Sequence, residues 1–142
     1  MSEDTTIAVL NALLALQYRS LPMFLRGAAP WTHYGDEKAA QALENIIADQ
    51  DAMAQRLADR VLGQGGRVDP GEYPMVFTDL HDLALEYLLG PMLEHQRRDV
   101  EAIGRCVADL ADDPDSRALA EEVLGSERAH LEWLEELVQT PV

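Results

Sequence analysis

Residues 126–138 read SERAHLEWLEELV and place a glutamate and a histidine three positions apart within an apolar repeat. The repeat steps by four, three, four and three residues through Val123, Glu127, His130, Leu134 and Leu137. Side chains with this spacing share one face of an α-helix. We therefore predict a helix over residues 116–139 in which Glu127 and His130 point into the protein together with the apolar side chains.

The same helical spacing recurs along the rest of the chain, whereas the alternation typical of strands is almost absent. It predicts three further helices, over residues 4–26, 37–62 and 79–112. Gln17 and Gln50 stand among the apolar positions of the first and second helices, so we expect both amides inside. Pro22 should bend the first helix, and Pro91 should kink the third, because proline lacks the backbone donor.

One long connection separates the helices into two pairs. Residues 63–77 read GQGGRVDPGEYPMVF, which is rich in glycine and proline and has no helical repeat. Two helical hairpins joined by one long crossover are the connectivity of a ferritin-like four-helix bundle. We predict an all-α fold in which residues 1–142 form one domain and the crossover runs the length of the bundle.

The composition limits the kinds of partner. The 26 acidic and 11 basic side chains give a formal charge of −15, which repels nucleic acid and anionic membrane surfaces. The single cysteine, Cys106, excludes an internal disulfide and fits a reducing compartment. The N-terminal MSEDTT lacks the pattern of a signal peptide, and no apolar run approaches the length of a membrane span. We expect a cytoplasmic protein.

Two stretches resemble the bacterioferritin and rubrerythrin branch of the ferritin-like superfamily. RLADRVLGQGG, residues 56–66, is similar to the end of that family's second helix and its Gly-Gly turn, and SERAHLEWLEELV is similar to its fourth helix. The resemblance covers most of residues 7–138. It implies a di-iron carboxylate site built from one Glu on each of two helices and a Glu-x-x-His on each of the other two.

Carrying these ligands over gives a degenerate site. Glu127 and His130 match the fourth-helix pair, but the second-helix pair falls on Gln50 and Met53, and the first-helix Glu falls on Gln17.

The third-helix ligand has two candidate positions. Equal spacing within the two hairpins leads from Glu127 back to Glu94. The helical wheel and the similarity of residues 100–104 to the family's third helix lead to Met92 instead. We favour the wheel, because loop lengths vary and helical faces do not.

The remaining donors suit a metal-free interior better than a dinuclear centre. Two ferrous ions bring about four positive charges, which one or two remaining carboxylates do not offset. A hydrogen-bonded layer containing Gln17, Gln50, Glu127 and His130 needs no cofactor. The alternative is iron or another single divalent metal held by Glu127, His130 and Glu94.

The sequence thus predicts a ferritin-like bundle that serves as a non-catalytic binding or structural module. The alternatives are a ferroxidase or di-iron oxidase with a non-standard ligand set, and iron storage. The resemblance implies a homodimer that pairs side by side through the first two helices, and such pairing would use outward apolar residues such as Trp31 or Tyr34 near their connection. No particular small ligand or protein partner is indicated.

Overall fold

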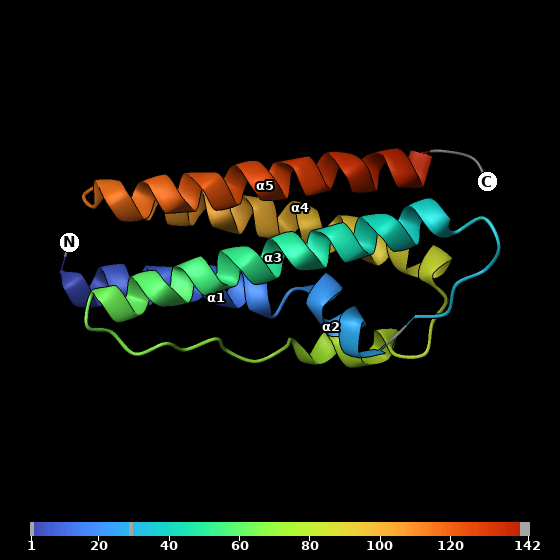
Figure 1. Cartoon of the computed structure of the whole chain (residues 1–142), viewed down its shortest axis with the longest axis horizontal. Helices are drawn as coiled ribbons and strands as arrows, with labels where there is room; N and C mark the ends of the chain where they lie inside the picture. Colours follow the sequence, from blue (N-terminus) through green and yellow to red (C-terminus); the bar gives the residue numbers. More distant parts are fainter. Residues whose placement is uncertain (1, 29, 140–142) are drawn as a thin grey trace.

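The computed structural model describes residues 2–28 and 30–139, and in this part of the chain the regular structure is helical (Figure 1). The α-helices are α1 (Glu3–Tyr18), α2 (Leu21–Ala28), α3 (Glu37–Gly63), α4 (Leu85–Asp109) and α5 (Pro114–Gln139), and a 3₁₀ helix, η1, spans Met75–Leu80. Within the described residues, β-type pairing is limited to an isolated bridge between Trp31 and Ala84. The predicted all-α fold is confirmed.

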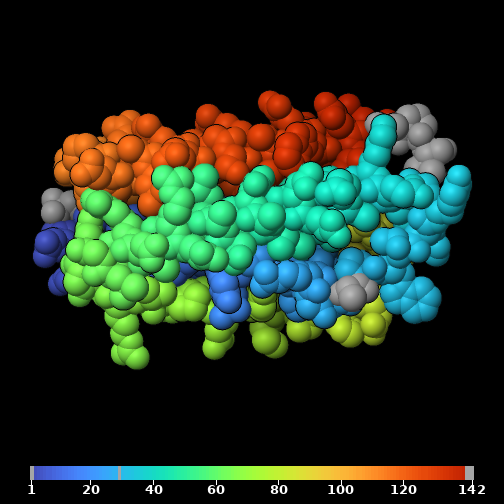
Figure 2. All heavy atoms as spheres, in the orientation of Figure 1, coloured from blue at the N-terminus to red at the C-terminus, as the bar shows by residue number. Residues whose placement is uncertain are grey.

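The long helices pair as two hairpins joined by a crossover. α1 packs mainly against α3, and α4 packs mainly against α5. The segment between α3 and α4, residues 64–84, runs the length of the bundle, so that α4 starts at the opposite end from the last turn of α3 (Figure 1). In the space-filling view α3 lies along the middle of one face, between α5 and the crossover (Figure 2). This is the predicted ferritin-like connectivity.

The first predicted helix is broken rather than bent. α1 ends at Tyr18 and α2 starts at Leu21, and the two helices are bent by 42°. Pro22 explains the break, because a proline ring clashes with the carbonyl four residues earlier. Ser20 caps the new helix by accepting a hydrogen bond from the Met23 backbone N–H at 3.2 Å.

The third predicted helix also starts later than its spacing suggested. Residues 75–80 form η1, Asp82 has a positive φ of 64°, and α4 begins only at Leu85. α4 then continues through Pro91 as one helix.

The core consists of two apolar clusters separated along the bundle. One cluster gathers around Leu13, Leu57 and Ile103, and the other around Ile46 and Leu88. On each of the long helices, buried polar residues interrupt the sequence between the two clusters: Gln17 on α1, Gln50 on α3, Gln96 on α4, and Glu127 and His130 on α5. The bundle therefore has a polar layer near its middle.

Among residues 2–28 and 30–139, no single helix is long and apolar enough to cross a bilayer. The bent pair of α1 and α2 reaches that length and apolar composition only when the two helices are taken together. Buried core helices share this composition, and Leu10, Leu13 and Leu21 of this pair are fully buried.

The residues expected to contribute to a dimer lie on the surface. Trp31 is 67% exposed and Tyr34 fully exposed, in the connection between α2 and α3. The Trp31 carbonyl accepts a hydrogen bond from Leu85 N at 2.7 Å, so this connection is fastened to the start of α4. The homodimer stays a prediction.

The turn after α3 brings the start of the crossover into close contact with α1 at Gly66. Gly66 N donates to Val61 O at 2.9 Å, and a Cβ at Gly66 would lie 2.9 Å from Ile7 Cδ1 and Cγ2. Gly66→Ala should therefore destabilise the fold by about 1–2 kcal/mol. Gly104→Ala, in an open position of α4, should instead stabilise it by about 0.5–1 kcal/mol. Urea unfolding of both variants measures the difference, and equal effects would contradict the predicted contact.

Candidate functional site

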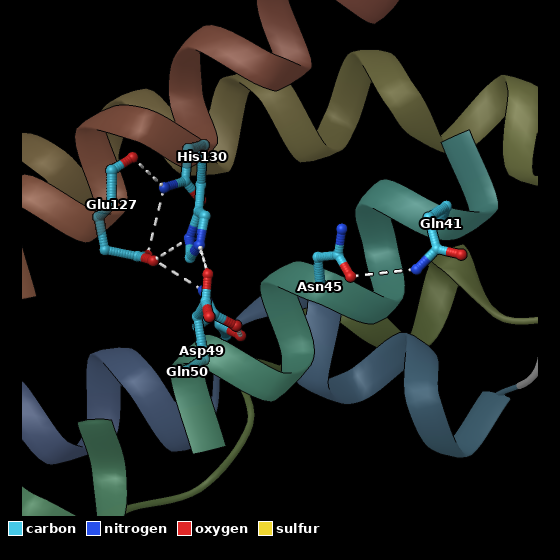
Figure 3. A network of polar contacts seen from close by, with 8 residues as sticks. Gln41, Asn45, Asp49, Gln50, Glu127 and His130 are labelled. Carbon is cyan, nitrogen blue, oxygen red and sulfur yellow. Dashed lines mark hydrogen bonds and ion pairs between the residues drawn. The ribbon is translucent and has the colours of Figure 1, made fainter. Parts of the chain in front are cut away.

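The polar layer is centred on the buried carboxylate of Glu127 (Figure 3). Gln50 on α3 donates from Nε2 to Glu127 Oε2 at 3.0 Å. Gln96 on α4 donates from Nε2 to the same oxygen at 3.2 Å and to the Glu127 backbone carbonyl at 2.9 Å. His130 Nδ1 lies 2.5 Å from the other carboxylate oxygen, Oε1. Protein groups therefore satisfy both oxygens of this fully buried carboxylate, as burial requires.

The orientation of the Gln50 amide is set by the break between α1 and α2. Ser20 Oγ donates to Gln50 Oε1 at 2.6 Å while accepting from Met23 N. Because the amide oxygen is occupied by Ser20, the amide nitrogen faces Glu127. A chain of hydrogen bonds thus runs from the first turn of α2 through α3 to α5.

His130 connects the buried layer to the surface. Its Nε2 lies 2.8 Å from Oδ2 of Asp49, which is exposed on α3, while its Nδ1 faces Glu127. Burial lowers the pKa of His130, but the hydrogen bonds and charges of Glu127 and Asp49 outweigh burial and raise the pKa above its usual value. An imidazolium donating to both carboxylates fits this geometry. Its contribution to stability is present at low pH and is lost as the pH rises through the raised pKa.

Asp99 on α4 is a second acidic group of the interior. It is half-buried, and no hydrogen bond or ion pair joins it to another described residue. Burial and, to a smaller extent, the charge of Glu127 raise its pKa to about 7, against the opposing charge of Arg98. The carboxyl is therefore partly protonated near neutral pH.

Sequence reasoning missed Asp99, Asp49 and Ser20. A signal existed for Asp99, because Met92, Gln96, Asp99 and Ile103 step by four, three and four and so share one helical face. Asp49 precedes Gln50 on the exposed side of α3, so no burial pattern marked it. Its contact with His130 depends on the packing of α3 against α5.

The remaining candidate ligands lie outside this network. Glu94 is on the exposed face of α4, so the structure does not bring it to Glu127, and equal hairpin spacing was the wrong guide to the inward residue. Met92 is buried in the apolar cluster of Leu88. Met53 packs against the opposite cluster, and its sulfur lies 3.8 Å from Arg56 Nη1.

The donors present do not fit a di-iron centre. Such a centre in a ferritin-like bundle takes four glutamates and two histidines, whereas this layer offers amides at Gln50 and Gln96. Glu127 and Asp49 contact opposite nitrogens of the His130 ring, so the three side chains do not converge on one point. Among residues 2–28 and 30–139, no group of three or more His, Cys, Asp or Glu side chains is arranged to hold a metal ion.

Comparison with known proteins agrees with the architecture. A sequence model of the ferritin-like domain matches residues 7–141, and the chain belongs to this family. The fold is similar to that of a ferritin-like, diiron-carboxylate protein from Bacillus anthracis str. Ames, with a TM-score of 0.80 and 20% sequence identity over 98% of this chain and 100% of that one. No curated protein matches the chain significantly.

The Asp99 carboxyl makes stability depend on pH. The folded protein binds the Asp99 proton more tightly than the unfolded chain, so this group lowers the free energy of unfolding as the pH rises from about 4 to about 7. Asp99→Asn should match wild type near pH 4 and exceed it above pH 7. We expect the free energy of unfolding of Asp99→Asn to exceed that of wild type by about 2 kcal/mol above pH 7. This is roughly half of the free energy that corresponds to the whole pKa shift, because the side chain is partly solvated.

Urea unfolding at several pH values checks this expectation. Asp59→Asn, which changes an exposed carboxyl of α3, is the control and should follow wild type. A difference between Asp99→Asn and wild type that does not vary with pH would contradict the argument.

The two buried glutamines should respond oppositely to substitution. Neither the nitrogen nor the oxygen of the fully buried Gln17 amide has a hydrogen-bond partner among the described residues. Gln17→Leu should therefore stabilise the protein by about 1–2 kcal/mol. Gln50→Leu should destabilise it by about 3 kcal/mol, because Glu127 and Ser20 each lose a buried partner. Thermal unfolding compares the two, and a loss of stability in Gln17→Leu would show that its amide is engaged.

Proposed function

We propose that this protein is a non-catalytic member of the ferritin-like family, a binding or structural module whose bundle is held by a hydrogen-bonded layer in place of a dinuclear metal centre. One observation carries the proposal. The Glu127 carboxylate, the fully buried carboxylate of the polar layer, is occupied by donors from Gln50, Gln96 and His130.

The orientation of these donors opposes a cation at Glu127. The N–H groups of Gln50 and Gln96 point at the carboxylate, and their positive ends would face an incoming metal ion. Turning the Gln50 amide to offer its oxygen would break the bond that Ser20 donates. An imidazolium at His130 also has no free lone pair, because both ring nitrogens carry protons.

The charges of the polar layer are also compensated without a metal ion. The imidazolium of His130 compensates one of its two carboxylate neighbours, Glu127 and Asp49, and the second is exposed to water. The buried hydrogen bonds among Gln50, Gln96, Glu127 and His130 stabilise one arrangement of the helices, because any other arrangement leaves these groups unpaired. The layer is thus sufficient for a structural role in the bundle.

A metal-binding function is the second candidate. Two observations favour it: the fold resembles a protein described as a diiron-carboxylate protein, and Asp49 adds a carboxylate beside His130. In this case Glu127 and His130 would act as ligands of a ferroxidase or di-iron oxidase with a non-standard ligand set. The two candidates differ in whether metal stabilises the layer.

Thermal unfolding with and without a strong chelator separates them. For protein purified without chelator, we expect no change in the wild-type melting temperature on chelation. Glu127→Ala should cost about 3 kcal/mol in either condition, because it leaves a cavity and unpaired amide donors. A chelator-induced fall that Glu127→Ala abolishes, or rapid saturable Fe(II) oxidation at two irons per chain, would overturn the proposal and support the second candidate.

A further inference from the structure

A pocket of about 570 Å³ opens between α1, the crossover and α4, beside the polar layer but outside it. Small side chains on the two helices, Ala12, Ala15 and Ala102, leave the space unfilled. Phe77 of η1 and Leu16 of α1 supply apolar walls. The volume is in the range of pockets that hold small organic ligands.

The inner polar group of this pocket is the carboxyl of Asp99. It is half-buried and has no hydrogen bond or ion pair with another described residue. The other carboxyls of the lining, Glu72 and Asp109, are exposed at the rim. A carboxyl that lines an apolar pocket without a protein partner is suited to a ligand that brings a donor and a positive charge.

The basic groups of the lining do not take this role. Arg19 donates from Nε to the Gly71 carbonyl at 2.9 Å, and its guanidinium lies over the rings of Tyr18 and Tyr73. Arg105 is exposed at the rim. His95 packs edge-on against Phe77 at 5.0 Å between ring centroids, and burial followed by the charge of Arg98 lowers its pKa, which keeps the ring neutral.

We propose that this pocket binds a small organic cation, an alkyl- or arylalkyl-ammonium compound whose charged group pairs with Asp99 and whose apolar body packs on Leu16 and Phe77. The negative charge of Glu127 and the net charge of −15 add to the attraction for a cation. An anionic ligand would meet Asp99 unpaired, which makes it the wrong class.

The proposal rests on the proposed function in one respect: it names the ligand class of the binding module. The pocket and the polar layer are nevertheless tested separately. Iron content and the effect of chelation test the proposed role of the polar layer, whereas ligand binding tests the proposed role of the pocket.

The experiment uses 2-phenylethylamine as the probe and 2-phenylethanol as its neutral counterpart, with titration followed by calorimetry and by amide NMR spectra. Wild type should bind the amine at least about tenfold more tightly than the alcohol, a difference of the size expected for a charge-assisted hydrogen bond. Amide shifts should concentrate on α1, η1 and α4.

Matched variants identify the anchor. Asp99→Asn keeps the shape of the pocket and should lose at least about tenfold in amine affinity, while Asp59→Asn should bind as wild type does. Ala102→Leu should weaken the binding of both the amine and the alcohol, because the larger side chain fills the pocket. Equal amine affinity of wild type and Asp99→Asn, equal binding of amine and alcohol, or shifts located away from these elements would overturn the proposal.

Discussion

The burial of one carboxylate constrains the whole bundle. Glu127 lies between two apolar clusters, where an ionised group without donors would cost several kcal/mol. Three helices therefore contribute to its compensation: α3 supplies Gln50, α4 supplies Gln96, and α5 itself supplies His130. The break after α1 takes part as well, because it places Ser20 where it orients the Gln50 amide. Local features far apart in the sequence are thus related through a single charge.

The sequence allows the fold to be predicted because its signals are periodic. The steps of three and four identify the long helices, and the single glycine- and proline-rich stretch identifies the crossover. The errors fall where local sterics compete with that period. Pro22 ends α1 instead of bending it, and the stretch before Leu85 adopts a 3₁₀ helix and a left-handed residue that apolar spacing does not reveal.

The candidate site was predictable only in part, for a physical reason. Inward-facing polar residues such as Gln17, Gln50, Glu127 and His130 follow from helical faces. Their partners depend on rotamers and on the depth at which the helices meet, which the pattern of one helix does not contain. Gln17 and Gln50 illustrate the difference, because both are fully buried but only Gln50 finds donors and acceptors among the described residues. Asp49 is the opposite case, an exposed residue that completes the His130 contacts.

The position of the polar layer between the two apolar clusters also fixes how the helices align lengthwise. Apolar side chains tolerate sliding, because one leucine can replace another after a shift of one helical turn. The Gln50, Gln96 and Glu127 contacts do not tolerate it, since a shift of about 5 Å, the rise of one turn, separates every donor from its acceptor. The polar layer therefore fixes the axial register of the helices, which apolar packing alone would leave free to shift along the bundle.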